Sequence, residues 1–409
     1  MDVGVLGGGF QGCCAALALA ERSVNVTLID RNDALLSRAA VANEGKVHLG
    51  YMYAGDPSLA TAKTMITGAL AFAPFLERQL CQSAQLMATS VPATYVVHRD
   101  SQRSCSEISA YLETVHGLVG EAAEGRSKAY FGKDLRSVLR PWSAAQIDEA
   151  FDPAIATAAF DTPEVAINPR KLAHAIREII AAHPRIEVRC NRIIVGANEE
   201  REGIRVWSNG QEGCAWDRFD HVVNALWDGR LEIDKCMGFR NNRPWLHRLK
   251  YGVSFRLPDG VRSPPSATFV LGPFGEVVSY DDRLIYLTWY PEGLQAISTD
   301  LRPPEWSTYP PEPLRSRVLT GTIRALSDVV PLLRGLQVDR LSEARVMGGV
   351  IVAWGKTDIH DPESELHRRY EIGVTSTGRY HSIDPGKLTM APYFAERCAE
   401  QIVGSARTA

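Results

Sequence analysis

One histidine, His48, stands in a segment whose residue types can support proton transfer. The segment reads Asn43-Glu44-Gly45-Lys46-Val47-His48-Leu49-Gly50. A neutral imidazole can take a proton from a hydroxyl or ammonium group, because its charge changes close to pH 7. His48 is therefore a candidate base or hydrogen-bond donor. The alternative is a structural histidine that orders its loop.

A glycine-rich turn near the N-terminus predicts a site for a dinucleotide. Gly7, Gly9 and Gly12 stand at GxGxxG spacing between a short apolar strand and an Ala- and Leu-rich helix. Gly7 permits a tight turn, Gly9 lets the backbone approach a pyrophosphate, and Gly12 lets helix and strand pack closely. Asp30 ends the second strand, where its carboxylate can accept hydrogen bonds from a ribose diol. The adjacent Arg31 leaves open whether that ribose carries a phosphate.

The composition limits the partners of this chain. Its 409 residues carry a net charge of −3, from 45 basic and 48 acidic side chains, and show no basic block. We therefore expect a small-molecule substrate and no nucleic-acid partner. No apolar run has transmembrane length, so no membrane segment is expected. The eight cysteines form neither a CxxC pair nor a zinc-spaced cluster, which predicts reduced thiols, no metal site and a cytoplasmic protein. The sequence carries no signal for the oligomeric state.

The elements that must position these residues fit two domains, which the length of the chain also favours. The strand–turn–helix–strand start predicts an α/β, Rossmann-like cofactor domain. Alternating residues over 248–290 predict an antiparallel sheet in an α+β substrate domain. Because no linker separates the two, we expect a discontinuous arrangement. The cofactor domain would comprise residues 1–90, 150–235 and 335–409, and the substrate domain residues 91–149 and 236–334.

Three local expectations concern segments between these elements. Asp56-Pro57 is expected to open a long helix, with Asp56 as its N-cap. Ser208-Asn209-Gly210 has the residue types of a turn between two strands. Residues 379–387 are expected to form a glycine-bounded loop that leads into a C-terminal helix.

In combination, these motifs resemble the D-amino acid oxidase-like (DAO) superfamily of FAD-dependent oxidoreductases, in order along most of the chain. The segment 43–50 is similar to the N-x-G-x-[IV]-H-x-G segment of L-2-hydroxyglutarate oxidases. Gly386-Lys387-Leu388-Thr389 is similar to the GKLT segment of glycerol-3-phosphate dehydrogenases. The resemblance implies FAD as the cofactor. It also implies a C-terminal helix whose N-terminus points at the pyrimidine ring of the flavin.

The resemblance further implies a set of cofactor contacts. Ile194 lies on the strand that usually meets the adenine, and Ala225 ends the return strand near the diphosphate. Lys46 would lie near the flavin, or would instead cap a turn. Lys387 stands at a helix start, where a cation is favoured only beside an anion, so it would contact the flavin rather than face solvent. The expected cofactor contacts are Gly7, Gly9, Gly12, Asp30, Arg31, Asn43, Gly45, Lys46, Ile194, Ala225, Gly386, Lys387, Leu388 and Thr389.

Two departures from the family pattern affect the expected substrate. Leu226-Trp227 replaces an Ala-Gly pair that lies near the diphosphate in relatives. Gly349-Val350-Ile351-Val352 occupies the place of a Gly-x-Arg-Pro segment, whose arginine holds a substrate carboxylate in many relatives. Without that arginine, a simple 2-hydroxy acid or amino acid is expected to be a poor substrate.

The expected activity is oxidation of a C–H bond next to an amine or hydroxyl group, with hydride transfer to the flavin and His48 beside the reacting carbon. Tyr251, Tyr280 and Trp289 lie on the alternating strands and are expected to contact the substrate. An NAD-dependent dehydrogenase is an alternative, although it leaves Gly386–Thr389 unexplained. A flavin-binding module without catalysis is a second alternative, which the missing arginine permits.

Overall fold

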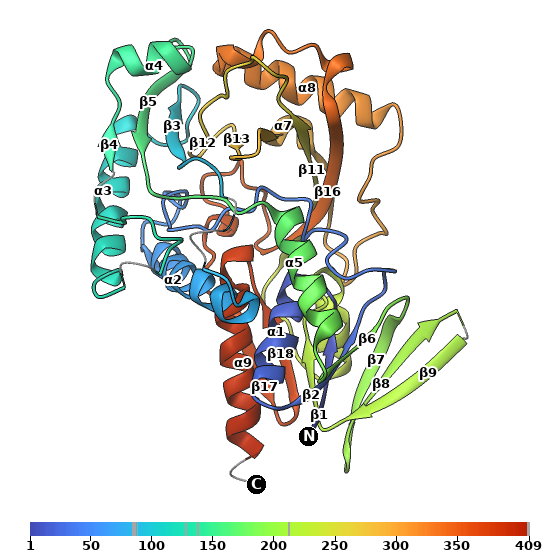
Figure 1. Ribbon diagram of the computed structural model, residues 1–409. Helices are drawn as coiled ribbons and strands as arrows, with labels where there is room; N and C mark the ends of the chain where they lie inside the picture. The colour runs from blue at the N-terminus through green and yellow to red at the C-terminus, as the bar shows by residue number, and fades with distance from the viewer. Residues whose placement is uncertain (84–86, 88, 127–128, 137–138, 212, 407–409) are drawn as a thin grey trace.

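The computed structural model has two regions, each built around a large β-sheet (Figure 1). The structure describes residues 1–83, 87, 89–126, 129–136, 139–211 and 213–406. In Figure 1 a nine-stranded sheet lies at the top beneath α8, and a six-stranded sheet lies at the bottom with both chain termini. The predicted α/β fold class is confirmed.

The six-stranded sheet is the Rossmann-like part of the molecule. β1 pairs in parallel with β2 on one side and with β10 on the other, whereas β17 runs antiparallel to β18 at the edge. In spatial order its strands are β17 (Gly373–Thr377), β18 (Tyr380–Asp384), β10 (His221–Asn224), β1 (Asp2–Leu6), β2 (Asn25–Ile29) and β6 (Ile186–Arg189). The first two strands thus lie where the sequence predicts them. β18 comes from the far end of the chain, so segments distant in sequence close this sheet.

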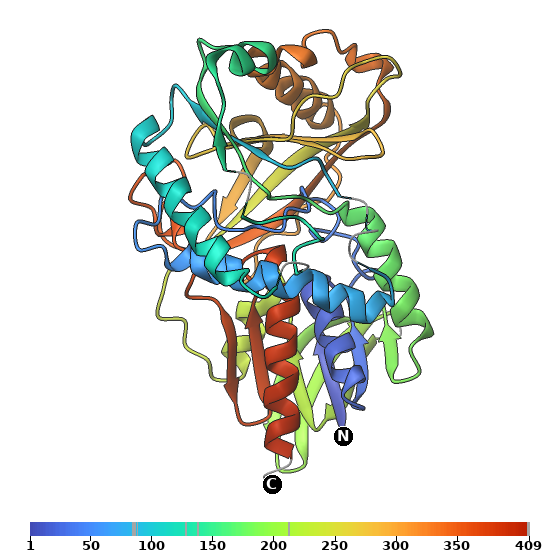
Figure 2. The ribbon, with the colours of Figure 1, turned by 60° about the vertical axis from the view of Figure 1, so that its left-hand side comes forward.

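Helices cover one face of the six-stranded sheet, and a smaller sheet covers the other. The helices are α1 (Phe10–Glu21), α5 (Pro169–Ala182) and α9 (Ala391–Ala406), and Figure 2 shows α1 and α9 side by side. The opposite face packs against the three-stranded sheet of β7 (Ile193–Glu200), β8 (Gly203–Gly210) and β9 (Gly213–Phe219), and against α6 (Arg230–Cys236). Cys13 and Cys14 are fully buried in α1, as expected for small packing residues.

The nine-stranded sheet is mainly antiparallel. Its strands are β15 (Leu294–Ser298), β11 (Trp245–Arg256), β14 (Leu284–Trp289), β13 (Gly275–Ser279), β12 (Ala267–Phe269), β3 (Thr94–His98), β5 (Ala156–Asp161) and β4 (Arg140–Pro141), with β16 (Ser342–Trp354) paired to β11. The remaining helices are α2 (Ala60–Leu80), α3 (Cys105–Ala122), α4 (Ala144–Ala150), α7 (Tyr290–Gly293) and α8 (Leu314–Val329). The sheet includes residues 156–161 and 342–354, two segments that were predicted from the sequence to belong to the cofactor domain. None of the helices in the described residues is long and apolar enough to cross a bilayer.

The three local expectations were wrong in detail. The helix after Asp56 begins at Ala60, because the Asp56 carboxylate bonds the Ser58 and Thr61 N–H groups and Leu59 adopts a left-handed conformation. Ser208-Asn209-Gly210 is the end of β8 and pairs with β9. Most of the expected loop 379–387 is β18, whose alternation was hidden by polar residues that lie inside the sheet.

Candidate active site

A large cavity opens at the carboxyl ends of β1, β2 and β10 and continues to the face of the nine-stranded sheet. Its volume is about 1750 Å³, including the space at its open mouth. In open α/β sheets this edge is where ligands bind. The predicted contacts that line the cavity are Gly7, Gly9, Asp30, Arg31, Asn43, Lys46, His48, Ile194, Ala225, Gly386, Lys387 and Leu388. Gly12, Gly45, Thr389, Tyr251, Tyr280 and Trp289 lie outside its lining.

The three glycines of the N-terminal turn have separate structural reasons. Gly7 has φ +102°, and an added Cβ would lie 2.6 Å from the Ala225 carbonyl oxygen. At Gly12 an added Cβ would lie 1.8 Å from the Gly7 carbonyl oxygen, so α1 packs directly against the turn. An added Cβ at Gly9 meets no atom within 4 Å, because this position faces the cavity. The turn is therefore a cradle that a side chain at Gly9 would fill, as a pyrophosphate site requires.

The acidic end of β2 is held in a fixed position. The Asp30 carboxylate accepts hydrogen bonds from the Gly8 N–H at 2.6 Å and from the Asn32 N–H at 2.8 Å. Its oxygen atoms retain lone pairs for a further donor. Arg31 is paired with Asp228 at 2.7 Å across the cavity wall. In the sequence, Arg31 left open a phosphate on the ribose. Because its guanidinium is paired with Asp228, Arg31 is not a free cation that such a phosphate would need.

The departure at Leu226-Trp227 changes the wall of the cavity. Trp227 adopts a left-handed conformation, with φ +57°, and its indole N–H donates to the Val350 carbonyl oxygen at 2.6 Å. This bond ties the end of β10 to β16. Val350 and Ile351, where the family resemblance led us to look for an arginine, also line the cavity.

Asn43 and Gly45 shape the loop that precedes His48. The Asn43 amide donates to the Ala39 carbonyl oxygen at 2.8 Å, and its Oδ1 accepts the Gly45 N–H at 2.7 Å. Gly45 has φ +69°, and an added Cβ would lie 1.9 Å from the Ile167 carbonyl oxygen. Gly45 therefore serves loop geometry, whereas Asn43 also reaches the cavity wall.

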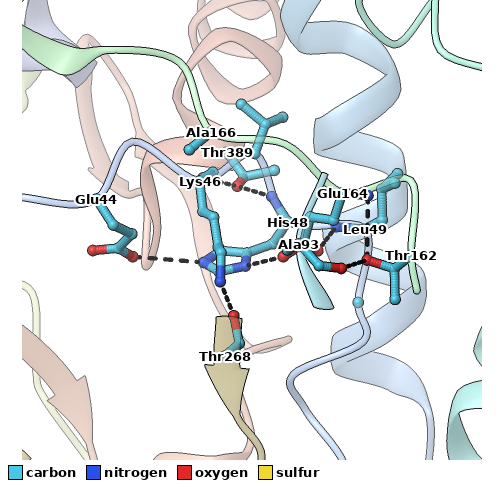
Figure 3. Close-up of polar contacts among 12 residues, drawn as sticks. Glu44, Lys46, His48, Leu49, Ala93, Thr162, Glu164, Ala166, Thr268 and Thr389 are labelled. Carbon is cyan, nitrogen blue, oxygen red and sulfur yellow. Dashed lines mark hydrogen bonds and ion pairs between the residues drawn. The ribbon is translucent and has the colours of Figure 1, made fainter. Parts of the chain in front are cut away.

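Figure 3 shows His48 at the centre of a buried polar cluster. Its ring is 1% exposed, and its Nδ1 lies 3.3 Å from Glu164 Oε1. Its Nε2 is buried, lies 3.9 Å from Glu44 Oε1, and has no hydrogen-bond partner among the described residues. His48 lines the cavity, and Nε2 is the ring nitrogen that Glu164 does not contact. Glu164 was missed in the sequence, where it lies 116 positions from His48 without a local motif.

Lys46 and Thr389 hold the same segment from two sides. The Lys46 ammonium pairs with Glu276 at 3.1 Å and also contacts the Thr268 hydroxyl. The Thr389 hydroxyl accepts the His48 backbone N–H at 2.9 Å, which joins this segment to the turn that starts α9. Thr389 thus acts through backbone position rather than by contact with the cavity.

Charged groups gather at this end of the cavity. Burial acts to raise the pKa of Glu44, but the charges of Lys387, Lys250 and His48 outweigh it and lower the pKa to about 2. Burial lowers the pKa of Lys387 to about 8, although Glu44 opposes the shift. Glu44 is therefore an anion near neutral pH, and Lys387 can lose its proton just above that range.

The predicted substrate contacts are corrected by strand parity. The β11 side chains Leu249, Tyr251 and Val253 pack in an apolar core, and Tyr251 donates to the Ser307 carbonyl oxygen there. Lys250 lies between them in sequence and therefore faces the cavity. Alternation of apolar and polar residues along β11 was the signal that could have identified Lys250.

The aromatic residues of β14 follow the same rule. Tyr286 lines the cavity, whereas Trp289, at odd spacing from it, packs against Phe269 on the other face. Tyr280 lies behind the wall and donates to the Glu44 carbonyl oxygen at 2.5 Å. We therefore no longer expect Tyr251 or Trp289 to contact substrate, and Tyr280 supports the Glu44 backbone. No group of metal-ligating side chains occurs among the residues that the structure describes.

Comparison with known proteins agrees with this geometry. Residues 2–355 match the family model for FAD dependent oxidoreductases (DAO). The chain therefore belongs to the DAO family of FAD-dependent oxidoreductases, and its cofactor is FAD. This membership sets aside the NAD-dependent alternative.

Solved structures show the same fold at low sequence identity. An iminodiacetate oxidase from Chelativorans sp. BNC1 has a TM-score of 0.66 at 16% identity, covering 98% of this chain and 95% of that one. An L-proline dehydrogenase from P. horikoshii has a TM-score of 0.69 at 14% identity, covering 99% and 93%. An FAD-bound L-alpha-glycerophosphate oxidase from Mycoplasma pneumoniae has a TM-score of 0.66 at 15% identity, covering 98% and 94%.

Proposed function

We propose that this flavoenzyme oxidises the C–H bond beside an amine or hydroxyl group of a small molecule, with His48 as the base. The observation that carries the proposal is the environment of the His48 ring. Its Nε2 is buried at the cavity wall without a hydrogen-bond partner among the described residues, while its Nδ1 faces a carboxylate. A buried polar nitrogen without a partner is costly unless a ligand satisfies it.

The cofactor would lie along the whole cavity. Its adenosine would lie between Ile194 and Asp30, and its pyrophosphate over Gly7–Gly9. The flavin ring would lie between the segment Asn43–Lys46 and the turn Gly386–Leu388. Support comes from the lining, which brings these segments together along one continuous space. The domain division predicted from the sequence is part of the same proposal, with residues 156–161 and 342–354 moved to the substrate side.

When bound, FAD would supply the acceptor for the hydride of the substrate C–H bond. His48 Nε2 takes the proton from the neighbouring amine or hydroxyl group, which lets the carbon–nitrogen or carbon–oxygen double bond form. Glu164 at Nδ1 and Glu44 near Nε2 would stabilise the positive charge that the ring gains. Tyr286 and Ile351 line the sheet side of the cavity and would exclude water there.

The test is anaerobic bleaching of the flavin absorbance by a substrate panel. Primary and secondary amines and alcohols of increasing size form one arm. Small 2-hydroxy and amino acids form the other, because Lys250 places a cation at the cavity wall. The proposal expects at least one amine or alcohol to bleach the flavin in a single turnover. A flavin that no member reduces, yet that dithionite reduces normally, would contradict it.

A further inference from the structure

Glu164 is a buried carboxylate that the chain holds in one orientation. Its side chain is 0% exposed. Glu164 follows β5, and its carbonyl oxygen accepts the N–H of Ala93, the residue before β3, at 2.8 Å. The Thr162 hydroxyl, itself bonded to the Ala93 carbonyl oxygen, accepts the Glu164 N–H at 3.3 Å. The backbone on either side is therefore fixed, and the carboxylate has little freedom to turn.

Three donors converge on this carboxylate, and they do not share the two oxygen atoms equally. Oε2 accepts the Leu49 backbone N–H at 2.6 Å. Oε1 accepts the Tyr95 hydroxyl at 2.5 Å and faces His48 Nδ1 at 3.3 Å (Figure 3 draws His48 and Glu164). Burial acts to raise the pKa of Glu164, but the interactions with His48, Lys46 and Tyr95 outweigh it and hold the pKa below its ordinary value. Near neutral pH the group is thus a carboxylate, which accepts hydrogen bonds and cannot donate them.

A carboxylate beside Nδ1 fixes the tautomer of the imidazole. Nδ1 must carry the proton to bond Glu164 Oε1, which leaves the lone pair on Nε2. Glu44 does not compete for Nε2 by a hydrogen bond, because 3.9 Å is beyond that distance. We propose that Glu164 is the positioning residue of the site, which holds His48 with its proton on Nδ1 and its Nε2 lone pair toward the cavity. Its kinetic consequence rests on the proposed function of His48.

An amide at position 164 is expected to reverse this arrangement. In Glu164→Gln the side-chain oxygen must face the Leu49 N–H, since the opposite orientation would place two donors against each other. The amide NH₂ then points at His48 Nδ1 and donates to it. Nε2 then carries the proton, so the nitrogen toward the cavity has no lone pair with which to act as a base. The change keeps the size of the side chain, removes its negative charge and reverses the direction of the hydrogen bond at Nδ1.

The direct test is the ¹⁵N spectrum of histidine-labelled holoenzyme at pH 8, with His48 assigned by its absence in His48→Asn. We expect the Nδ1–H form to exceed the Nε2–H form by at least about tenfold in the wild type, and the ratio to invert in Glu164→Gln. Tyr95→Phe is the matched control, because it removes another donor to Oε1 but leaves the Leu49 bond; the wild-type tautomer should persist. A wild-type ring protonated on Nε2, or on both nitrogens, would overturn the proposal even if Glu164→Gln failed to fold.

The kinetic readout separates this inference from the proposed function. With an amine or alcohol that bleaches the wild-type flavin, Glu164→Gln should lower the limiting rate of flavin reduction by about 10²–10⁴-fold. The substrate dissociation constant should change by less than about threefold. An inverted tautomer with a wild-type reduction rate would leave the positioning role in place and contradict His48 as the base. An unchanged tautomer in Glu164→Gln would contradict the positioning role alone.

Discussion

The Gly9 position should separate cofactor binding from folding. Its backbone has φ −74° and ψ −177°, which alanine adopts without strain, and an added Cβ would meet no atom within 4 Å. In Gly9→Ala the free energy of unfolding of the apoprotein should therefore change by less than about 1 kcal/mol. The new methyl group would project into the cavity, where the pyrophosphate is proposed to lie. Losing one charge-assisted hydrogen bond, about 1.5–3 kcal/mol, corresponds to a fall in FAD affinity of roughly 10–150-fold.

Gly12→Ala is the matched variant with the opposite expectation. Its added Cβ would lie 1.8 Å from the Gly7 carbonyl oxygen, so α1 and the turn must separate by about 1 Å or more to restore an ordinary contact. Such overpacking costs about 1–3 kcal/mol and sometimes more. The apoprotein should lose stability by at least this amount, whether or not FAD is added.

Two assays on flavin-free protein compare the variants. Urea denaturation measures the free energy of unfolding, and FAD titration followed by flavin fluorescence measures the dissociation constant. Wild-type FAD affinity in Gly9→Ala would show that the pyrophosphate does not approach this turn. Wild-type stability in Gly12→Ala would refute the close packing of α1 on the Gly7 carbonyl group.

Three further predictions concern other parts of the chain. Asp30→Ala should weaken FAD binding roughly 10–150-fold by removing an acceptor for the ribose, measured by the same titration; an unchanged dissociation constant would refute that contact. Lys46→Met should destabilise the apoprotein by about 3–5 kcal/mol, because Glu276 is left buried without its partner. The double variant Lys46→Met/Glu276→Leu should recover much of that loss. Equal losses of the two variants in urea denaturation would contradict the ion pair. Burial and the neighbouring His221 lower the pKa of His381 to about 4. As the pH falls below 6.5, the unfolded chain therefore protonates this histidine before the folded chain does. Stability present above pH 6.5 is then lost as the pH falls toward 4. His381→Gln should reduce this pH-dependent loss by about 3 kcal/mol, and an unchanged pH dependence of the free energy of unfolding would count against it.

The end of the cavity at Gly7 and Asp30 could be predicted from the sequence because its signals are local. The GxGxxG spacing, the strand before it and Asp30 lie within one strand–turn–helix–strand unit, and the structure places Gly7 and Asp30 at one edge of the sheet. The match at 43–50 also singled out His48, which the structure places at the cavity wall. Such segments carry their geometry in their own turns and caps, so no distant contact is needed to recognise them.

The end of the cavity at His48 and the nine-stranded sheet could not be predicted as well, because it depends on pairing between distant segments of the chain. The contact between Glu164 and His48 depends on the pairing of β5 with β3, and no local motif near position 164 predicts it. Tyr251 was chosen for its chemistry, although the apolar residues at 249 and 253 share its face and predict a core position. Strand parity, read strictly, would have selected Lys250 instead.

The role of His48 as the base can be tested by the rate of anaerobic flavin reduction in His48→Asn, with FAD content and substrate dissociation constant determined on the same samples. The variant keeps a polar side chain of similar reach but has no base at Nε2. We expect normal FAD content, substrate binding within about threefold of the wild type, and a limiting reduction rate lower by about 10²–10⁴-fold. A fully loaded variant that reduces its flavin at the wild-type rate would contradict it.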